Sequence, residues 1–400
     1  MVIVMANIIF HIDVNNAFLS WSAVDLLNKG YKDDIREMDA IIGDETNNRK
    51  GIVLAKSNSA KSKGVITGES IYLARKKCPN IKIFPPQYHL YQEMSHKLFD
   101  FILKYTPDIE VFSIDECFVD YGKVKKLYGE EEKFAHKLKN EIKNDLGFTV
   151  NIGIGNNKLC AKMASDFSKP NQVHTLYENE VKTKLWPLPV ELLYGVGKVT
   201  AEKLKKINIF TIEDLAKYSP IELSKFFKNQ ATKMIESANG IDYSNVKTTI
   251  EPPKGISHSM TLKYDLITKE EIEIQLKTIA ERLSLRLRKL NQYTDVIAVT
   301  LKNNNFNVYN HQQKITNPTN ITKEIYLIAK KVFNEMWKND PIRLVGIRLD
   351  NLSKKVYYQT SLFEKHDNRK KESNLDTIID ELKRKYGDNI IKSNVNKKDN

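Results

Sequence analysis

Two adjacent acids, Asp115 and Glu116, stand in the apolar stretch SIDECFVD at residues 113–120. The apolar residues around them give the pattern of a half-buried strand, where carboxylates are uncommon. Burying a lone carboxylate costs free energy, so such a group normally has a partner that stabilises its charge. We therefore expect a positive charge close to this pair.

A third acid, Asp13, comes near the end of the apolar run ANIIFHIDV at residues 6–14. Successive side chains on a strand point to opposite faces, so Asp115 and Glu116 can bind one ion only where their strand bends or ends. Asp13 could face Asp115 from a neighbouring strand. Three carboxylates without a nearby Cys or His suit a hard cation, Mg²⁺ or Mn²⁺. Two such ions about 3.5–4 Å apart serve in-line phosphoryl transfer. For any single acid, a capped turn or a surface salt bridge is the alternative.

The charge balance points to the class of partner. Lys and Arg number 63 against 50 Asp and Glu, which gives a formal net charge of +13. This favours a polyanion, with nucleic acid as the first expectation and an anionic membrane surface as the second.

Other features of the composition indicate the compartment. No apolar run approaches the roughly 20 residues that span a bilayer. The start MVIVMANIIFHID lacks the basic region and cleavage site of a signal peptide. Three widely spaced cysteines fit a reducing cytosol and argue against a zinc site or a disulfide framework. We expect a cytoplasmic protein with no membrane partner.

The length of 400 residues predicts two to four domains. Strand-like and helical segments alternate in the first part of the chain, with strands at 6–14, 51–55, 108–121 and 148–155 and helices at 19–29, 69–78, 129–146 and 157–166. This alternation indicates an α/β or α+β sheet domain over about 1–170. After the Pro-rich WPLP at 186–189, short stretches broken by glycine over 190–240 are typical of a small helical module.

A second, smaller α+β domain is expected after EPPKG at 251–255, which has the composition of a linker. Its strands are predicted in SHSMTLKY, TDVIAVTLKN and IRLVGIRLDNL, and its helices at 269–290 and 321–338. The last 40 or so residues are highly charged, and we expect them to be partly disordered. They contain one short amphipathic pattern, at 375–387.

Three blocks of the sequence resemble the Y-family DNA polymerases, the DinB/UmuC translesion group: HIDVNNAFLSWSA at 11–23, SIDECFVD, and VNIGIGNNKLCAKMASDFSKPNQV at 150–173. They occur in the family's order and with its approximate spacing, and the resemblance covers about 1–355. It implies an α+β multidomain fold, a right-hand polymerase with a ferredoxin-like palm, small fingers, a helical thumb and an α+β little-finger domain. A DinB-like role and a UmuC-like role with accessory subunits both fit these blocks.

The resemblance assigns domains to the expected segments. The palm and fingers would occupy 1–185, with the fingers at roughly 25–80. The thumb would occupy 186–240, a linker 241–255 and the little finger 256–355. A charged tail with a clamp-binding peptide would follow at 356–400.

The resemblance also assigns the acids. Asp13 and Asp115 would bridge two Mg²⁺ ions, for which Mn²⁺ is an alternative. Glu116 would be a further ligand, and the main-chain carbonyl of Val14 would complete the shell. All three carboxylates would be catalytic.

Two further residues match nucleotide-binding positions of the family. Phe18, five residues after Asp13, would lie under the sugar of the incoming nucleotide and exclude a 2′-hydroxyl, the group that distinguishes RNA from DNA. From the residue alone, a core position is the favoured interpretation of Phe18, and only its spacing from Asp13 favours the nucleotide-binding role. Lys169, in SKPN, matches the lysine that contacts the triphosphate, where a cation offsets the charge of the leaving pyrophosphate.

The sequence departs from the family in the fingers. The family often has a Tyr and an Arg three residues apart on the triphosphate, and Asn58 and Lys61 stand at these places. Lys61 keeps the charge but loses the planar, bidentate fork of Arg. The nucleotide would be held more weakly or differently, with Lys56 as a possible substitute.

Two segments are expected to bind DNA. LLYGVGKVTAEKLKKINIFTIEDL at 192–215 resembles a helix-hairpin-helix, in which Gly195 and Gly197 permit the turn, main-chain N–H groups hold a phosphate and Lys198 adds charge. An ordinary helix connection is the alternative. In the little-finger segment, Arg282 and Arg286 lie at helical spacing opposite a leucine stripe and would follow the template–primer duplex. A solvated helix face is the alternative there.

QTSLF at 359–363 matches the peptide by which bacterial polymerases bind the sliding clamp (β). Gln359, Leu362 and Phe363 would be its anchors, because apolar side chains in a polar segment normally serve a partner.

The expected protein is thus a monomeric, error-prone translesion DNA polymerase, a mutator enzyme that adds dNTPs to a primer on template DNA without proofreading. Two other classes of protein are the alternatives. A non-catalytic DNA- or clamp-binding protein would not need the three acids. A nucleotidyl cyclase can use a two-metal carboxylate site, but it would not need a helix-hairpin-helix or a clamp peptide.

Overall fold

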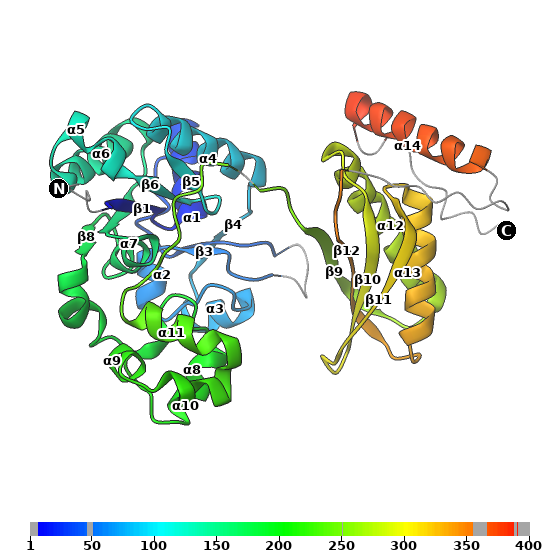
Figure 1. The fold of residues 1–400 in the computed structure, drawn as a ribbon. Coiled ribbons are helices and arrows are strands. Elements are labelled where there is room, and N and C mark those ends of the chain that lie inside the picture. The colour runs from blue at the N-terminus through cyan, green and yellow to red at the C-terminus, as the bar shows by residue number, and fades with distance from the viewer. Residues whose placement is uncertain (1–6, 46–50, 250, 355–365, 388–389, 391–400) are drawn as a thin grey trace. The chain divides into compact units, whose positions relative to one another are not determined.

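The computed structural model describes residues 7–45, 51–249, 251–354, 366–387 and 390. They divide into two compact units, one with the described residues up to 249 and one with those from 251 onward. The division falls inside the segment 241–255 that the sequence predicts as a linker. In Figure 1, the first unit runs from blue to green and the second from yellow to red.

A five-stranded sheet of order β5-β6-β1-β7-β8 forms the centre of the first unit. The strands are β1 Ile9–Val14, β5 Ile109–Val111, β6 Glu116–Asp120, β7 Val150–Gly155 and β8 Val173–Leu176. Strand β1 pairs antiparallel with both β6 and β7. Asp13 and Glu116 therefore lie on two of the three inner strands rather than at an edge of the sheet.

The two faces of β1 have different surroundings because its side chains alternate. Phe10, Ile12 and Val14 belong to the largest apolar core. Three helices contribute to that core: α1 Ala17–Asn28, α4 Tyr88–Leu103 and α6 Glu131–Leu146. The opposite face of the sheet carries Ile9, which packs with Phe118 and with Ala161 of helix α7, Lys158–Ser165. A short helix, α5 Lys125–Tyr128, precedes α6.

A smaller sheet of order β3-β2-β4 lies in the segment expected to form the fingers. Its elements are β2 Ala40–Ile42, β3 Ala55–Lys56, β4 Lys82–Phe84, α2 Asn58–Ser62 and α3 Ile71–Lys77. The strand predicted at 51–55 is wrong in extent, since only Ala55 belongs to a strand and Ile52 forms an isolated bridge with Ser70.

The helical module contains α8 Lys198–Lys205, α9 Ile212–Ala216, α10 Pro220–Phe227 and α11 Ala231–Ala238. Its apolar core includes Leu159, Cys160 and Met163 of α7. Helix α7 therefore packs against the sheet on one side and against the helical module on the other.

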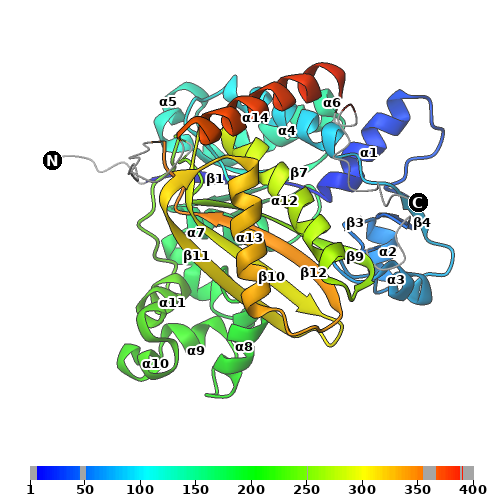
Figure 2. The same cartoon turned by 90° about the vertical axis from the view of Figure 1, so that its right-hand side faces the viewer.

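The second unit is a four-stranded antiparallel sheet of order β11-β10-β12-β9. Its elements are β9 Gly255–Leu266, α12 Lys269–Lys289, β10 Thr294–Asn303, β11 Val308–Thr319, α13 Thr322–Met336 and β12 Ile342–Asp350. Figure 2 shows α12 and α13 over one face of this sheet. The sequence did not predict β11, because it is an edge strand with mostly exposed, polar residues.

A long helix, α14 His366–Tyr386, belongs to the second unit. The sequence predicted only a short amphipathic pattern at 375–387. Arg288 of α12 binds it through Asp376 at 3.1 Å and Asp380 at 2.5 Å, and the Thr322 N–H donates to Asp376 at 2.8 Å. These charged contacts hold a segment whose composition alone indicated partial disorder. Within the described ranges, no helix has the length and apolar character that a membrane crossing requires.

Candidate active site

The antiparallel register of β1 and β6 brings the predicted acids together. Asp13 and Glu116 are direct Cα partners. Because such pairs project on the same face, their side chains are neighbours. Strand β6 begins at Glu116, and Asp115 lies in the turn before it. The main-chain carbonyl of Asp115 accepts the Val14 N–H at 3.0 Å. The pair thus lies at a strand end, the place where adjacent acids can approach one site.

Helix α7 lies directly on the sheet next to these acids because β7 carries glycines. A Cβ at Gly153 would lie 1.9 Å from the Ala161 carbonyl oxygen and 2.3 Å from the Ser165 nitrogen. A side chain there would displace the helix. The close approach places Lys162 and Ser165 at the acids.

Glu116 is held by two side chains. Its Oε2 lies 2.6 Å from Lys162 Nζ and 3.1 Å from His11 Nε2. The other ring nitrogen of His11 lies 2.8 Å from Ser165 Oγ. Burial alone would raise the pKa of Glu116, but the hydrogen bonds from His11 and Lys162 outweigh it and lower that pKa to about 2. Glu116 is therefore ionised at neutral pH, and burial lowers the pKa of His11.

Asp13 has a different partner. Lys169 forms an ion pair with it and a second one with Asp166 at 2.9 Å. Burial raises the pKa of Asp13, and Lys169 offsets only part of this shift. Burial would lower the pKa of Lys169, but the Asp13 carboxylate raises it. A basic side chain thus compensates each of the two facing acids.

Asp115 is oriented by its own turn. Its Oδ1 accepts the hydroxyl of Ser113 at 2.6 Å, and its main-chain N–H points to the same hydroxyl at 3.3 Å. No role was predicted for Ser113, His11 or Lys162. The signal for His11 was its position two residues before Asp13, which puts both on one face of the strand.

The carboxylates of Asp13, Asp115 and Glu116 are of the right chemical type for a hard cation, because carboxylate oxygens are the ligands that Mg²⁺ prefers. In geometry, the side chains are not gathered around a common point. Across the described ranges, no group of three His, Cys, Asp or Glu side chains is arranged to hold a metal ion. Lys169 on Asp13 and Lys162 on Glu116 supply positive charge at these two carboxylates.

Phe18 lies in the first turn of α1, near Asp13, and is half-buried. Its ring stacks on Tyr91 with centroids 4.3 Å apart and an interplanar angle of 6°. This stacking fixes the ring plane, and the partial exposure leaves part of the ring accessible.

Asn58 and Lys61, which stand where the family often has a Tyr and an Arg, lie on α2. Asn58 is its exposed first residue and accepts a long hydrogen bond of 3.4 Å from Asn16, next to β1. Lys61 lies on the same short helix and is also exposed. Lys56 donates to Thr67 at 2.9 Å, and burial together with Lys61 lowers its pKa.

The predicted helix-hairpin-helix residues form a turn before α8. Gly195 has a φ of +90°, which favours glycine, and Gly197 is the N-cap residue of the helix that begins at Lys198. A Cβ at either glycine would meet open space. Gly197, Lys198 and Val199 at this helix start are exposed.

In the second unit, Arg282 and Arg286 are exposed on α12, and Arg282 contacts His258 at 3.2 Å. The sheet face opposite the helices carries Ser257 and Ser259 beside Arg348 and Gly346, which are their register partners on β12. Arg348 forms an ion pair with Asp350 at 2.6 Å. The predicted clamp peptide, 359–363, lies outside the described residues.

Comparison with known proteins identifies the family. The model of the impB/mucB/samB family matches residues 12–166, that of its C-terminal domain matches 253–362, and the IMS family HHH motif matches 178–209. "DNA polymerase IV" of Clostridium acetobutylicum is 45% identical over 392 residues, covering 98% of both chains. "DNA polymerase IV" of Clostridium kluyveri is 34% identical over 398 residues, covering 97% of this chain and 98% of that protein.

A solved structure supports the fold. A chain described as "Y-family DNA polymerase chimera Dbh-Dpo4(243-245)-Dbh" superposes with a TM-score of 0.73 over 86% of this chain and 99% of its own. At 24% identity this likeness speaks for the fold alone. The predicted fold class, a Y-family polymerase of mixed α+β architecture, is confirmed. The chain belongs to the impB/mucB/samB family and is a bacterial Y-family DNA polymerase of the DinB type, a DNA-directed DNA polymerase.

Proposed function

We propose that this polymerase performs error-prone translesion synthesis, adding dNTPs to the primer 3′ end opposite intact and damaged template bases. The observation that carries the proposal is the register of Asp13 with Glu116, with Asp115 in the turn beside them. The expected substrates are primer–template DNA and dNTPs, and we expect a cytoplasmic monomer without proofreading.

Two divalent cations, Mg²⁺ or alternatively Mn²⁺, are proposed to be held by Asp13, Asp115, Glu116 and the Val14 carbonyl. When bound, they would acidify the primer 3′-hydroxyl and neutralise the leaving pyrophosphate. The 3′-oxygen forms a bond to the α-phosphorus of the dNTP, and the bond from that phosphorus to pyrophosphate breaks.

The remaining side chains bind and orient. Lys169 exchanges its partner Asp13 for the triphosphate, where a cation stabilises developing charge. Phe18 supports the sugar and excludes a 2′-hydroxyl. Asn58 and Lys61 face the triphosphate from α2 and bind it without the bidentate fork of an arginine.

Contacts to the duplex are proposed to be made by main chain and basic side chains. The turn at Gly195 and Gly197, with Lys198, would hold a backbone phosphate without sequence preference. Arg282 and Arg286 would follow the duplex, so the affinity for primed DNA should fall as salt rises. Equal affinity at low and physiological salt would contradict this part.

The decisive experiment is primer extension with Mg²⁺. The wild-type protein should extend an annealed primer, and Asp115→Ala should not, because a cation ligand is lost. Asp120→Asn is the matched control, because Asp120 lies at the other end of β6 and should leave extension intact. A wild-type protein that binds DNA without extending it would instead be a non-catalytic binding protein, and one that cyclises nucleotides would be a cyclase.

Clamp binding is proposed for QTSLF through Gln359, Leu362 and Phe363. Deleting 359–363 should abolish the stimulation of synthesis by the sliding clamp and spare synthesis without it. Loss of both activities would mean that the segment serves folding instead.

A further inference from the structure

Lys162 lies between the acids and a neighbouring cavity. Its Nζ is 2.6 Å from Glu116 Oε2. The same Nζ lies 5.3 Å from the centre of the Phe112 ring and 5.4 Å from that of the Tyr194 ring. The side chain is 13% exposed. A small rotation of its stem would carry the ammonium from the acid towards these two rings.

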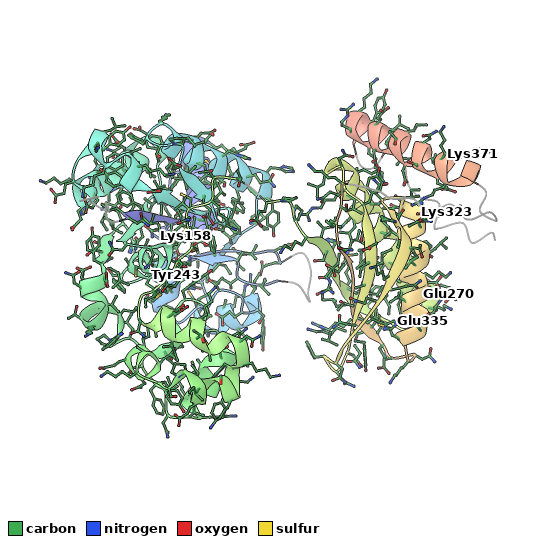
Figure 3. The ribbon with its side chains drawn as sticks, viewed as in Figure 1. Lys158, Tyr243, Glu270, Lys323, Glu335 and Lys371 are labelled. Carbon is green, nitrogen blue, oxygen red and sulfur yellow. The ribbon has the colours of Figure 1, made fainter. Side chains whose placement is uncertain are left out.

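The cavity has a volume of about 450 Å³. Its walls come from the turn before β6, from α7, and from α11 with the loop that follows it. We call it the α7 pocket. Its lining includes the aromatic side chains Phe112, Phe118, Tyr194 and Tyr243, three lysines (Lys158, Lys162 and Lys233) and two acids (Glu236 and Asp242). Lys158 and Tyr243 are labelled in Figure 3.

The α7 pocket is next to the predicted DNA-binding turn. Tyr194 lines the pocket and immediately precedes Gly195, and its main-chain N–H donates to the sulfur of Met163 on α7 at 3.3 Å. A strand whose backbone is held at the Gly195–Lys198 turn and whose 3′ end reaches Asp13 and Glu116 must therefore pass the pocket. In sites for a nucleic-acid strand, basic side chains contact the backbone and aromatic side chains stack on bases, so Lys162 is a group of this pocket that suits a phosphate.

The two lysines on the facing acids differ in what else they contact. Lys169 pairs with Asp13 and also with Asp166 at 2.9 Å, whereas Lys162 pairs, among the described residues, with Glu116 alone. Once divalent cations neutralise Asp13 and Glu116, both lysines are repelled by the added charge, and Lys162 is the one left without a carboxylate partner. A largely buried ammonium without a partner is costly. Lys169 has the triphosphate as its new partner in the proposed function, and Lys162 needs an anion on its own side.

We propose that the α7 pocket takes one phosphodiester of the primer strand and that Lys162 becomes its ligand when cations occupy the acids. The inference rests on the proposed function, because it presumes that Glu116 binds a cation. Lys162 then has two positions, one on Glu116 in the cation-free protein and one on the DNA.

Lys158 provides a matched control in the same pocket, one turn earlier on α7. Its Nζ lies 2.7 Å from both oxygens of Glu110, and Glu110 also accepts the Lys247 N–H at 2.7 Å. Glu110 is not among the acids that would bind cations. Lys158 therefore keeps its partner whether or not cations are present.

The test measures binding of primed DNA by fluorescence anisotropy over a salt series, without nucleotide, in Mg²⁺ and in EDTA. One phosphate contact contributes about 0.9 to the slope of log affinity against log salt. In Mg²⁺, Lys162→Met should reduce the slope by about that amount, whereas Lys162→Arg and Lys158→Met should not. In EDTA, all four proteins should have the same slope. An equal reduction in both media, or in neither, would overturn the proposal.

A second measurement locates the phosphate. Primers carrying one methylphosphonate at successive positions remove one negative charge at a time. At one position near the 3′ end, the substitution should weaken binding by wild type but not by Lys162→Met, whereas at the other contacted phosphates both proteins should lose affinity equally. Coupling at no position would contradict the proposal.

Two further measurements, dNTP binding without DNA and primer extension, distinguish this proposal from its alternatives. If Lys162→Met weakened dNTP binding without DNA, the pocket would hold a nucleotide phosphate rather than a phosphodiester. Primer extension by wild type, run in parallel, tests the proposed function independently. An active wild type whose salt slope is insensitive to Lys162 would refute this inference alone.

Discussion

Asp13 and Glu116 are register partners on adjacent antiparallel strands, and a different lysine binds each carboxylate. Both lysines come from α7 and the segment that follows it, so the position of this helix decides how the acids are compensated. The polymerase thus carries its own counter-charges at the place where cations are proposed to bind.

The close packing of α7 against the sheet can be tested with a substitution of Gly153. Gly153→Ala puts a Cβ 1.9 Å from the Ala161 carbonyl oxygen, so α7 must move away from the sheet. We expect the unfolding free energy to fall by about 1–3 kcal/mol, as in overpacked cores. Gly197→Ala is the control, because a Cβ there meets open space; its unfolding free energy should change by less than about 1 kcal/mol. Thermal unfolding of both variants measures this, and equal stabilities would contradict the packing argument.

Sugar selection is expected to depend on Phe18. Phe18→Ala should admit ribonucleotides, because the ring that stacks on Tyr91 and would block a 2′-hydroxyl is removed. Single-nucleotide incorporation with paired dNTP and rNTP substrates measures the discrimination. Unchanged discrimination would return Phe18 to the role of a core residue.

The Glu116 network predicts a pH dependence of stability. The pKa of Glu116 is lowered from 4.5 to about 2, so its ionised form stabilises the fold above pH 4.5 and this contribution is lost as the pH falls towards 2. Glu116→Gln has no such contribution. The stability advantage of wild type over this variant should shrink by about 1–3 kcal/mol between about pH 6 and about pH 3, allowing for partial exposure. Calorimetric melting of both proteins across this range measures it, and a constant difference would show that the network does not favour the ionised acid.

The ion pairs of Arg288 are expected to hold α14 in place. Arg288→Met should expose α14 to hydrogen exchange and cost about 1–3 kcal/mol, because Asp376 and Asp380 would be left half-buried without their partner. Lys323→Gln removes a more exposed pair with Glu372 and should cost no more than about 1 kcal/mol. Similar protection of α14 in both variants would indicate that other contacts hold it.

Lys61 offers a test of the fingers. Lys61→Arg restores the planar guanidinium that the family often has at this position, so KM for dNTP should fall while the affinity for primed DNA stays the same. Steady-state extension with varied dNTP measures this. An unchanged KM would mean that α2 does not reach the triphosphate.

Much of the secondary structure follows from local pattern. The helices predicted at 129–146, 157–166, 269–290 and 321–338 are confirmed, with small differences at their ends. Strand β11 and helix α4 were missed. Strand β11 is a polar edge strand whose pairing with β10 depends on a partner distant in the sequence.

The sequence by itself determined the family and the polymerase activity, and it predicts the three acids as the catalytic site, because these inferences depend on residue types at fixed spacings along the chain. Only the tertiary structure decided how the acids are held. Lys162 and Lys169 reach Glu116 and Asp13 because glycines on β7 let α7 lie directly on the sheet. That arrangement depends on strand order and on a close approach of main chains, which no local pattern of residues specifies.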